Sequence, residues 1–141
     1  MAGERPLPTP DHESAEFWRR VATHSLALQR CAGCGTVRFY PRALCPECLG
    51  QPADWVPVSG RGTVYSFTVC YRPAAEAFAA ATPYIVALVD LDEGVRLLSN
   101  LIDCAPAEAR VGMPVILIYE DVAPGLALYK FRPAHAEPRR R

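Results

Sequence analysis

The sequence of 141 residues predicts a mainly β protein with a short N-terminal helix, a small metal-binding ribbon and a five-stranded barrel. Two closely spaced CxxC pairs predict the ribbon, and five strand-like segments after them predict the barrel. A short amphipathic segment before the cysteines predicts the helix. The expected boundaries are 1–25 for an N-terminal tail and helix, 26–54 for the ribbon, 55–133 for the barrel and 134–141 for a disordered tail.

The helix is expected to begin at Thr9-Pro10 and to end near residue 23. This dipeptide offers an N-cap followed by proline at the first helical position. Phe17, Trp18 and Val21 then fall on one side of the helix, and this face has to be buried against another surface. The sequence leaves open whether that surface belongs to this chain or to another subunit.

Four cysteines form the ribbon's candidate metal site. They are arranged as Cys31-Ala-Gly-Cys34 and Cys45-Pro-Glu-Cys48, with ten residues between the pairs. This spacing places four thiolates around one tetrahedral ion and predicts structural Zn²⁺. Gly35 and Gly50 are expected to take positive φ where backbone N–H groups turn toward the sulfurs. Two disulfides, or core cysteines spaced by chance, are the alternative.

The strands beside the cysteines are expected at 26–30 and 37–40. Two strands of this length bury too little surface to be stable alone. Structural zinc contributes about 10–16 kcal/mol in small peptides, which is comparable to the stability of a whole domain. The ribbon is therefore expected to depend on its metal. Cys70 and Cys104, outside the two pairs, are expected to be inert packing residues.

Five strand-like segments predict the barrel. They span 63–71, 85–91, 95–102, 115–119 and 125–131. Their lengths and the glycines at their bends fit a small closed Greek-key barrel of the OB type, with a five-stranded open sheet as the alternative. Asp92-Glu93-Gly94 is expected to form a hairpin turn with Gly94 in the left-handed region. The alanine-rich segment 74–82 is expected to be a loop with a helical turn, where OB folds often place ligand contacts.

Charge and hydropathy exclude some classes of function. Lys+Arg and Asp+Glu both number 15, so the formal net charge is zero. Nucleic-acid-binding proteins usually carry a basic surplus, so this balance argues against nucleic acid as a partner. No apolar run approaches the length of about 20 residues that spans a bilayer, and no secretory signal is visible. Cysteines kept as thiolates fit a reducing compartment, so a cytoplasmic protein without membrane contact is expected.

The order of the motifs is typical of one family. The motifs are Phe17-Trp18, Leu28-Gln29-Arg30-Cys31, Phe39-Tyr40-Pro41-Arg42, Gly60-Arg61-Gly62-Thr63, Pro83-Tyr84-Ile85 and Val111-Gly112-Met113-Pro114. Together with the two CxxC pairs, over about 11–133, they resemble the DUF35 family. The resemblance implies a rubredoxin-like zinc ribbon joined to an OB-fold.

The resemblance also implies an accessory role. DUF35 proteins accompany thiolase-fold enzymes as non-catalytic subunits or scaffolds and help to form the acyl-CoA channel. The partner, of thiolase or steroid side-chain aldolase type, supplies the reactive groups, and acyl-CoA is a ligand of the complex. The sequence agrees, because it contains no Ser-His-Asp signature, no GxSxG elbow and no Gly-rich phosphate loop. The chain is therefore not expected to be an enzyme by itself, and we expect it to contribute no catalytic residues.

Candidate acyl-CoA contacts lie around the ribbon and its junction with the barrel. They are Arg38, Arg42, Arg61 and Tyr40. Guanidinium groups form charge-assisted hydrogen bonds with phosphates, which is the reason for choosing the arginines. The alternatives are solvated surface arginines and a Tyr40 that packs the ribbon against the barrel.

Two further functions remain open at this point. Zinc ribbons and OB-folds elsewhere bind single-stranded nucleic acid through aromatic stacking in a basic groove. CxxC knuckles also hold iron in rubredoxin-like electron carriers.

Overall fold

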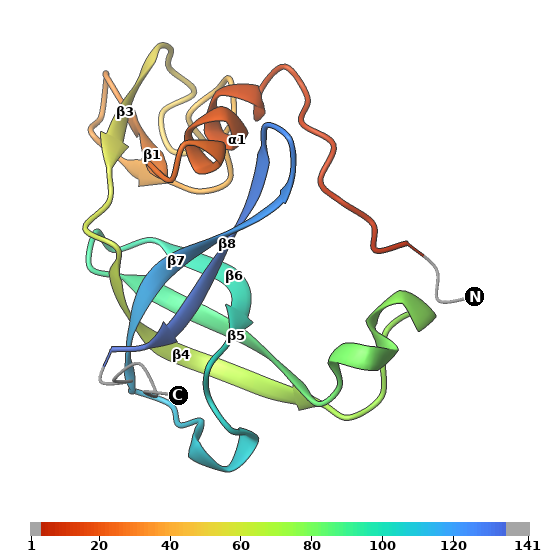
Figure 1. Cartoon of the computed structure of the whole chain (residues 1–141). Helices are drawn as coiled ribbons and strands as arrows, with labels where there is room; N and C mark the ends of the chain where they lie inside the picture. Colours follow the sequence, from red (N-terminus) through yellow and green to blue (C-terminus); the bar gives the residue numbers. More distant parts are fainter. Residues whose placement is uncertain (1–3, 135–141) are drawn as a thin grey trace.

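The computed structural model describes residues 4–134, which form one α-helix, a three-stranded sheet and a closed barrel (Figure 1). The helical elements are α1 (Ala15–Ala22) and two short 3-10 helices, η1 (Glu76–Ala81) and η2 (Pro106–Glu108). The ribbon strands are β1 (Ala27–Cys31), β2 (Val37–Arg38) and β3 (Ala53–Pro57). The barrel strands are β4 (Arg61–Cys70), β5 (Tyr84–Leu91), β6 (Arg96–Leu101), β7 (Pro114–Ala123) and β8 (Leu126–Pro133). The tail expected at 134–141 lies, apart from Ala134, outside the described residues. Within 4–134 no helix is long and apolar enough to cross a bilayer.

Helix α1 begins later than the sequence predicts. The expected start at Thr9-Pro10 is wrong, because these residues have no regular structure and the first turn forms at Asp11. The Asp11 carboxylate accepts the backbone N–H groups of Glu13 (3.1 Å) and Ser14 (2.8 Å). In return, the Asp11 N–H donates to Ser14 Oγ at 3.0 Å. These reciprocal hydrogen bonds satisfy backbone N–H groups that have no partner at the start of a helix. Thr9 makes no such hydrogen bond within the described residues.

The barrel confirms the five-stranded prediction. Its strands follow the order β4-β5-β6-β8-β7 and close on themselves, so the open-sheet alternative is wrong. All neighbours are antiparallel except β6 and β8, which run parallel and pair at a single register position, Leu101 with Phe131. Gly94 has φ 83°, as the predicted hairpin requires, and η1 is the helical turn expected within 74–82. Alternate residues of β5 are buried, which fills the barrel interior at the period of a strand.

Strand β3 was not predicted as part of the ribbon. The ribbon sheet has the order β2-β1-β3, and β1 pairs with β3 along its whole length, from Ala27 opposite Pro57 to Cys31 opposite Ala53. The expected boundary between residues 54 and 55 therefore falls inside a ribbon strand. Strand β2 has two residues and is shorter than the predicted 37–40.

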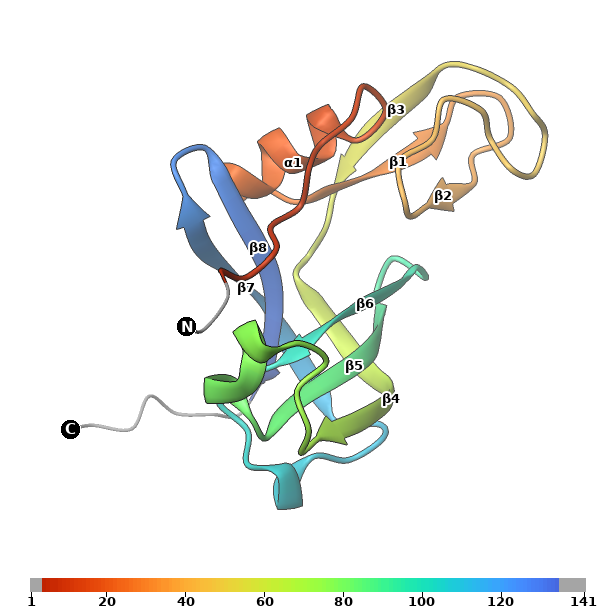
Figure 2. The ribbon, with the colours of Figure 1, turned by 90° about the vertical axis from the view of Figure 1, so that its right-hand side faces the viewer.

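Helix α1 packs within its own chain, which answers the question that the sequence left open. The β7–β8 hairpin is longer than predicted, and its extension brings β8 against α1 (Figure 2). Five rings meet there, and we call them the aromatic junction: Phe17, Trp18, Phe39, Tyr40 and Tyr129. Phe17 is fully buried at its centre, and Trp18 Nε1 donates to the Tyr40 hydroxyl at 2.8 Å. Helix, ribbon and barrel thereby share one hydrophobic core.

Gly62 lies where β4 passes close to β5. A Cβ at this position would come within 2.7 Å of Val89 Cγ1 and 2.8 Å of the Asp90 carbonyl oxygen. We expect Gly62→Ala to lower the free energy of unfolding by about 1–3 kcal/mol, because the backbone has to move to admit the methyl group. Urea unfolding measures this loss. Ser66→Ala, at an exposed position on the same strand, is the control and is expected to change stability by less than about 0.5 kcal/mol. Equal unfolding midpoints for the two variants would contradict the close contact.

Candidate metal centre

The four cysteines of the CxxC pairs converge beside the end of β1. The Sγ atoms of Cys31, Cys34, Cys45 and Cys48 all lie within 4.8 Å of one another. The Cys31–Cys48 and Cys34–Cys45 sulfur pairs are each 3.6 Å apart. Tetrahedral zinc with Zn–S bonds of about 2.3 Å separates its sulfurs by about 3.8 Å, so these four thiols fit one ion. A disulfide bond is about 2.05 Å long, so the arrangement is one of free thiols and not of two disulfides.

The first pair is held by a tight turn that directs backbone N–H groups at sulfur. The Gly35 N–H donates to the Cys31 carbonyl oxygen at 2.9 Å, and Gly35 takes the predicted positive φ of 75°. Hydrogen bonds from the backbone N–H groups of Cys34 and Gly33 lower the pKa of the Cys31 thiol below its usual value. These contacts favour the thiolate, which is the form that binds a metal.

The second pair differs from the prediction. Gly50 was expected to take positive φ, but Leu49 does so instead, with φ 59°. Gly50 is needed for close approach, because a Cβ there would lie 3.2 Å from Cys48 Sγ. Aligning the two pairs puts Leu49 opposite Gly35, since each follows the second cysteine of its pair. This alignment is the sequence signal that could have predicted the positive φ at Leu49.

The thiols influence one another electrostatically. Hydrogen bonds from the Thr36 side chain and backbone lower the pKa of Cys34 to about 6. The Gly50 N–H favours the Cys48 thiolate, but the sulfurs of Cys31 and Cys34 outweigh it and raise the pKa of Cys48 to about 11. Four thiolates at this spacing repel one another, so a cation is required for all four to be ionised together. The site is therefore suited to a divalent metal.

A metal held here has a structural role. Cys31 and Cys45 are buried and Cys34 and Cys48 are exposed, so the four thiolates bridge the ribbon interior and its surface. Four sulfur ligands complete a tetrahedral zinc site and leave no position for water or substrate. When bound, the ion joins the turn after β1 to the turn before β3 and so fixes the shape of the ribbon.

Arg38, a candidate acyl-CoA contact, lies inside the ribbon. Its side chain is 6% exposed, Nε donates to Gln29 Oε1 at 3.1 Å, and Nη2 donates to the Arg42 carbonyl oxygen at 2.8 Å. Gln29 Oε1 also accepts the Arg42 N–H at 2.8 Å. Arg38 and Gln29 therefore order the segment that leads to the second cysteine pair. This burial argues against a contact between Arg38 and acyl-CoA.

The other candidates divide between the two sheets. Tyr40 belongs to the aromatic junction, where its ring packs on Phe17 and its hydroxyl accepts a hydrogen bond from Trp18, which agrees with the alternative of a packing role. Arg42 is exposed on the ribbon beside it. Arg61 is exposed on β4 of the barrel, where it pairs with Ile116. The structure thus groups Arg38, Tyr40 and Arg42 in one segment and places Arg61 on another element.

A closed OB-type barrel joined to a four-thiol ribbon defines a zinc-ribbon/OB-fold protein. Family models agree with this class and with its order along the chain. Residues 18–53 match the model described as the rubredoxin-like zinc ribbon domain of ChsH2. Residues 55–117 match the model described as the C-terminal OB-fold domain of ChsH2.

Curated relatives extend this match over most of the chain. The chain is 42% identical to a probable enoyl-CoA hydratase alpha subunit of Thermomonospora curvata, over 92% of this chain and 40% of that protein. It is 34% identical to a DUF35 domain-containing scaffold protein of Methanocaldococcus jannaschii, over 82% of this chain and 87% of that protein. It is 35% identical to the benzoylsuccinyl-CoA thiolase subunit BbsA of Thauera aromatica, over 73% of this chain and 72% of that protein. The chain spans about two fifths of the length of the hydratase alpha subunits that it matches.

A solved structure shows the same architecture. A chain of the Ltp2-ChsH2(DUF35) aldolase superposes with a TM-score of 0.82 and 41% identity, over 90% of this chain and 98% of that chain. The chain belongs to the DUF35 family. The rubredoxin-like zinc ribbon and the OB-fold expected from the resemblance are confirmed.

Proposed function

We propose that this chain is a non-catalytic accessory subunit that docks on a thiolase-fold partner and helps to form its acyl-CoA channel. The partner makes or breaks a C–C bond, as thiolases and steroid side-chain aldolases do. The observation that carries the proposal is the near full-length similarity to the DUF35 chain of an aldolase assembly. The similarity to a thiolase subunit supports the same class of partner.

The chemistry of the metal centre supports an accessory role. Its four thiolate ligands complete the coordination of zinc, so a bound ion has no position at which to activate a nucleophile. The ion instead stiffens a ribbon that would be too small to be stable alone. A rigid ribbon fixed to the barrel by the aromatic junction is suited to presenting a defined surface to a partner.

Three exposed side chains remain candidates for contact with acyl-CoA in the complex. Arg42 and Arg61 offer guanidinium groups for phosphates, and Tyr40, at 36% exposure, offers the outer edge of the aromatic junction. We place the complex in the cytoplasm, because the six cysteines of this chain are free thiols and a reducing compartment preserves free thiols.

Co-expression tests the proposal. This chain, carrying an affinity tag, is produced together with a thiolase-fold protein encoded beside it in the genome. We expect the untagged partner to co-purify, and we expect the complex to turn over acyl-CoA faster than the partner alone. An unrelated OB-fold protein that carries the same tag and is co-expressed with the same partner is the control for non-specific capture. A partner that is soluble and fully active alone, with no complex formed, would refute the subunit role.

A further inference from the structure

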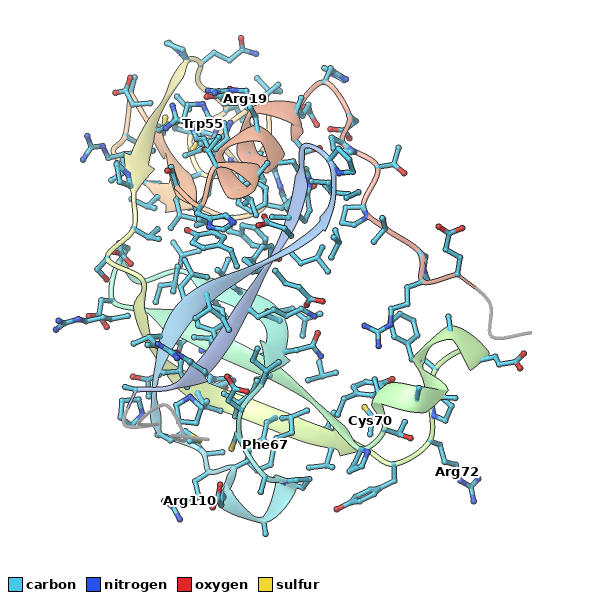
Figure 3. The ribbon with its side chains drawn as sticks, in the orientation of Figure 1. Arg19, Trp55, Phe67, Cys70, Arg72 and Arg110 are labelled. Atoms are coloured by element: carbon cyan, nitrogen blue, oxygen red, sulfur yellow. The ribbon has the colours of Figure 1, made fainter. Side chains whose placement is uncertain are left out.

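A cleft opens on the outside of the barrel between η1 and the line where β6 meets β8. Figure 3 draws the side chains of the elements around it. The volume of the cleft is about 440 Å³, within the range of about 300–1,000 Å³ that small-molecule sites occupy. We call it the seam cleft. Its apolar walls come from Phe78 of η1, Tyr84 and Ile85 of β5, and Ile102 after β6. Two cations, Arg5 and Lys130, line the same space.

The seam cleft exists because β6 and β8 barely pair. They share one register position, Leu101 with Phe131, and both of these side chains are buried in the barrel. The preceding residue on each strand, Asn100 and Lys130, faces the opposite side, because successive side chains of a strand alternate. These two residues therefore meet at the surface of the seam, where the Lys130 ammonium donates to Asn100 Oδ1 at 2.6 Å.

The Lys130 ammonium is fixed in position and incompletely paired. The side chain is 15% exposed, and its partner Asn100 is itself held by a hydrogen bond from Nδ2 to the Ile85 carbonyl oxygen at 3.1 Å. Glu120 Oε2 forms an ion pair with Nζ at 3.9 Å, a separation too long for a direct hydrogen bond. An ammonium has three N–H donors, so within 4–134 two of them have no acceptor. Burial lowers the pKa of Lys130, which reflects the cost of keeping this charge away from water.

The charges around the seam cleft restrict the kind of anion that fits. Arg5 lies over the Phe78 ring at 5.6 Å from its centroid and is exposed to solvent, so Lys130 is the less exposed of the two cations. Asp103 and Glu120 also line the cleft and balance the two cations. These carboxylates repel a dianionic phosphate about twice as strongly as a monocarboxylate, because the repulsion scales with the charge of the ligand. A single carboxylate needs only the free donors of Lys130, and an apolar body attached to it would cover the aromatic walls.

We propose that the seam cleft binds an amphipathic monocarboxylate. The carboxylate accepts hydrogen bonds from Lys130 Nζ, and the apolar body packs on Phe78 and Tyr84. This site is separate from the metal centre and does not require the partner subunit, so its test is independent of the accessory function.

Three matched probes test the chemistry on the isolated full chain: 1-naphthaleneacetate, its neutral amide 1-naphthaleneacetamide, and 1-naphthyl phosphate. Calorimetry is expected to show that the carboxylate binds about tenfold more tightly than the amide, because a charge-assisted hydrogen bond is lost with the charge. The phosphate is expected to bind more weakly than the carboxylate. Backbone amide chemical shifts are expected to change at residues of η1 and around Lys130.

Two variants separate the parts of the site. Lys130→Met keeps the aliphatic stem and is expected to weaken carboxylate binding about tenfold while leaving amide binding unchanged. Phe78→Ala, on η1 at the surface, is expected to weaken both probes. Arg72→Met removes an exposed cation outside the lining and is the control, with no expected change. Equal affinities for acid and amide, tighter binding of the phosphate, no binding of the carboxylate, or undiminished carboxylate binding by both cleft variants would each overturn the proposal.

Discussion

Replacing Cys45 by serine is expected to abolish metal binding and unfold the ribbon sheet. Cys45 is fully buried, and its sulfur lies 3.6 Å from that of Cys34. A serine hydroxyl is not ionised at neutral pH and is a poor zinc ligand, so three thiolates remain. Without the ion, β1 and β2 are joined at only two register positions, which cannot offset the chain entropy of the turns that hold the cysteines.

The magnitude of this effect follows from the metal's share of the stability. Structural zinc contributes about 10–16 kcal/mol in small peptides, against about 5–15 kcal/mol for the net stability of an ordinary domain. Metal analysis is expected to show about one zinc ion per chain before the substitution and almost none after it. Hydrogen exchange is expected to become fast in β1, β2 and β3. A strong chelator added to the unmodified chain is expected to have the same effect.

Cys70→Ser is the matched control, because Cys70 is a half-buried cysteine on β4, outside the metal centre. It is expected to keep its zinc and to lose less than about 1 kcal/mol of stability. The metal site is wrong if Cys45→Ser retains its full metal content and an unchanged melting profile.

Replacing Phe17 by alanine is expected to have the second largest effect. Phe17 is fully buried, and its ring centroid lies 5.2 Å from that of Trp18, 5.6 Å from Phe39 and 5.9 Å from Tyr129. The truncation leaves a cavity where helix, ribbon and barrel meet. We expect a loss of about 3–5 kcal/mol in the free energy of unfolding, measured by urea denaturation. Such a loss is a large share of the stability of a domain of this size.

An exposed aromatic provides the comparison for Phe17. Tyr71 is 70% exposed, so Tyr71→Ala is expected to change stability by less than about 0.5 kcal/mol. Phe17→Leu keeps most of the volume and is expected to fall between the two. If Phe17→Ala is no more destabilising than Tyr71→Ala, the aromatic junction does not hold the two sheets together.

The parts of the fold that the sequence predicted correctly are those with strong local signals. Short runs of apolar and β-branched residues bounded by glycine or proline predicted all five barrel strands, and Gly94 marked the hairpin turn because few other residues adopt its φ of 83°. The CxxC spacing predicted for a similar reason that the four cysteines converge, since two pairs of cysteines so close together have few other uses. Each of these features depends on neighbours along the chain.

The errors arose where local signals compete. Thr9-Pro10 and Asp11 are both acceptable helix starts, and the hydrogen bonds between Asp11 and Ser14 select the second. Strand β3 (Ala53–Pro57) was not predicted, because it is defined by its pairing with β1, a partner more than 20 residues away. Leu49 takes the positive φ that Gly35 takes in the first pair, although leucine does not favour it, and Gly50 is instead the residue that lies close to the Cys48 sulfur.

The sequence by itself determined the cluster of four cysteines, the number of barrel strands and the family, because each is recorded in the type and spacing of particular residues. Tertiary structure alone decided that α1 packs on its own barrel, that Arg38 is buried in the ribbon, and that Lys130 meets Asn100 at a seam. These features depend on contacts between residues far apart in the chain. Pairing across such distances is set by how whole surfaces fit together, which no short stretch of sequence specifies.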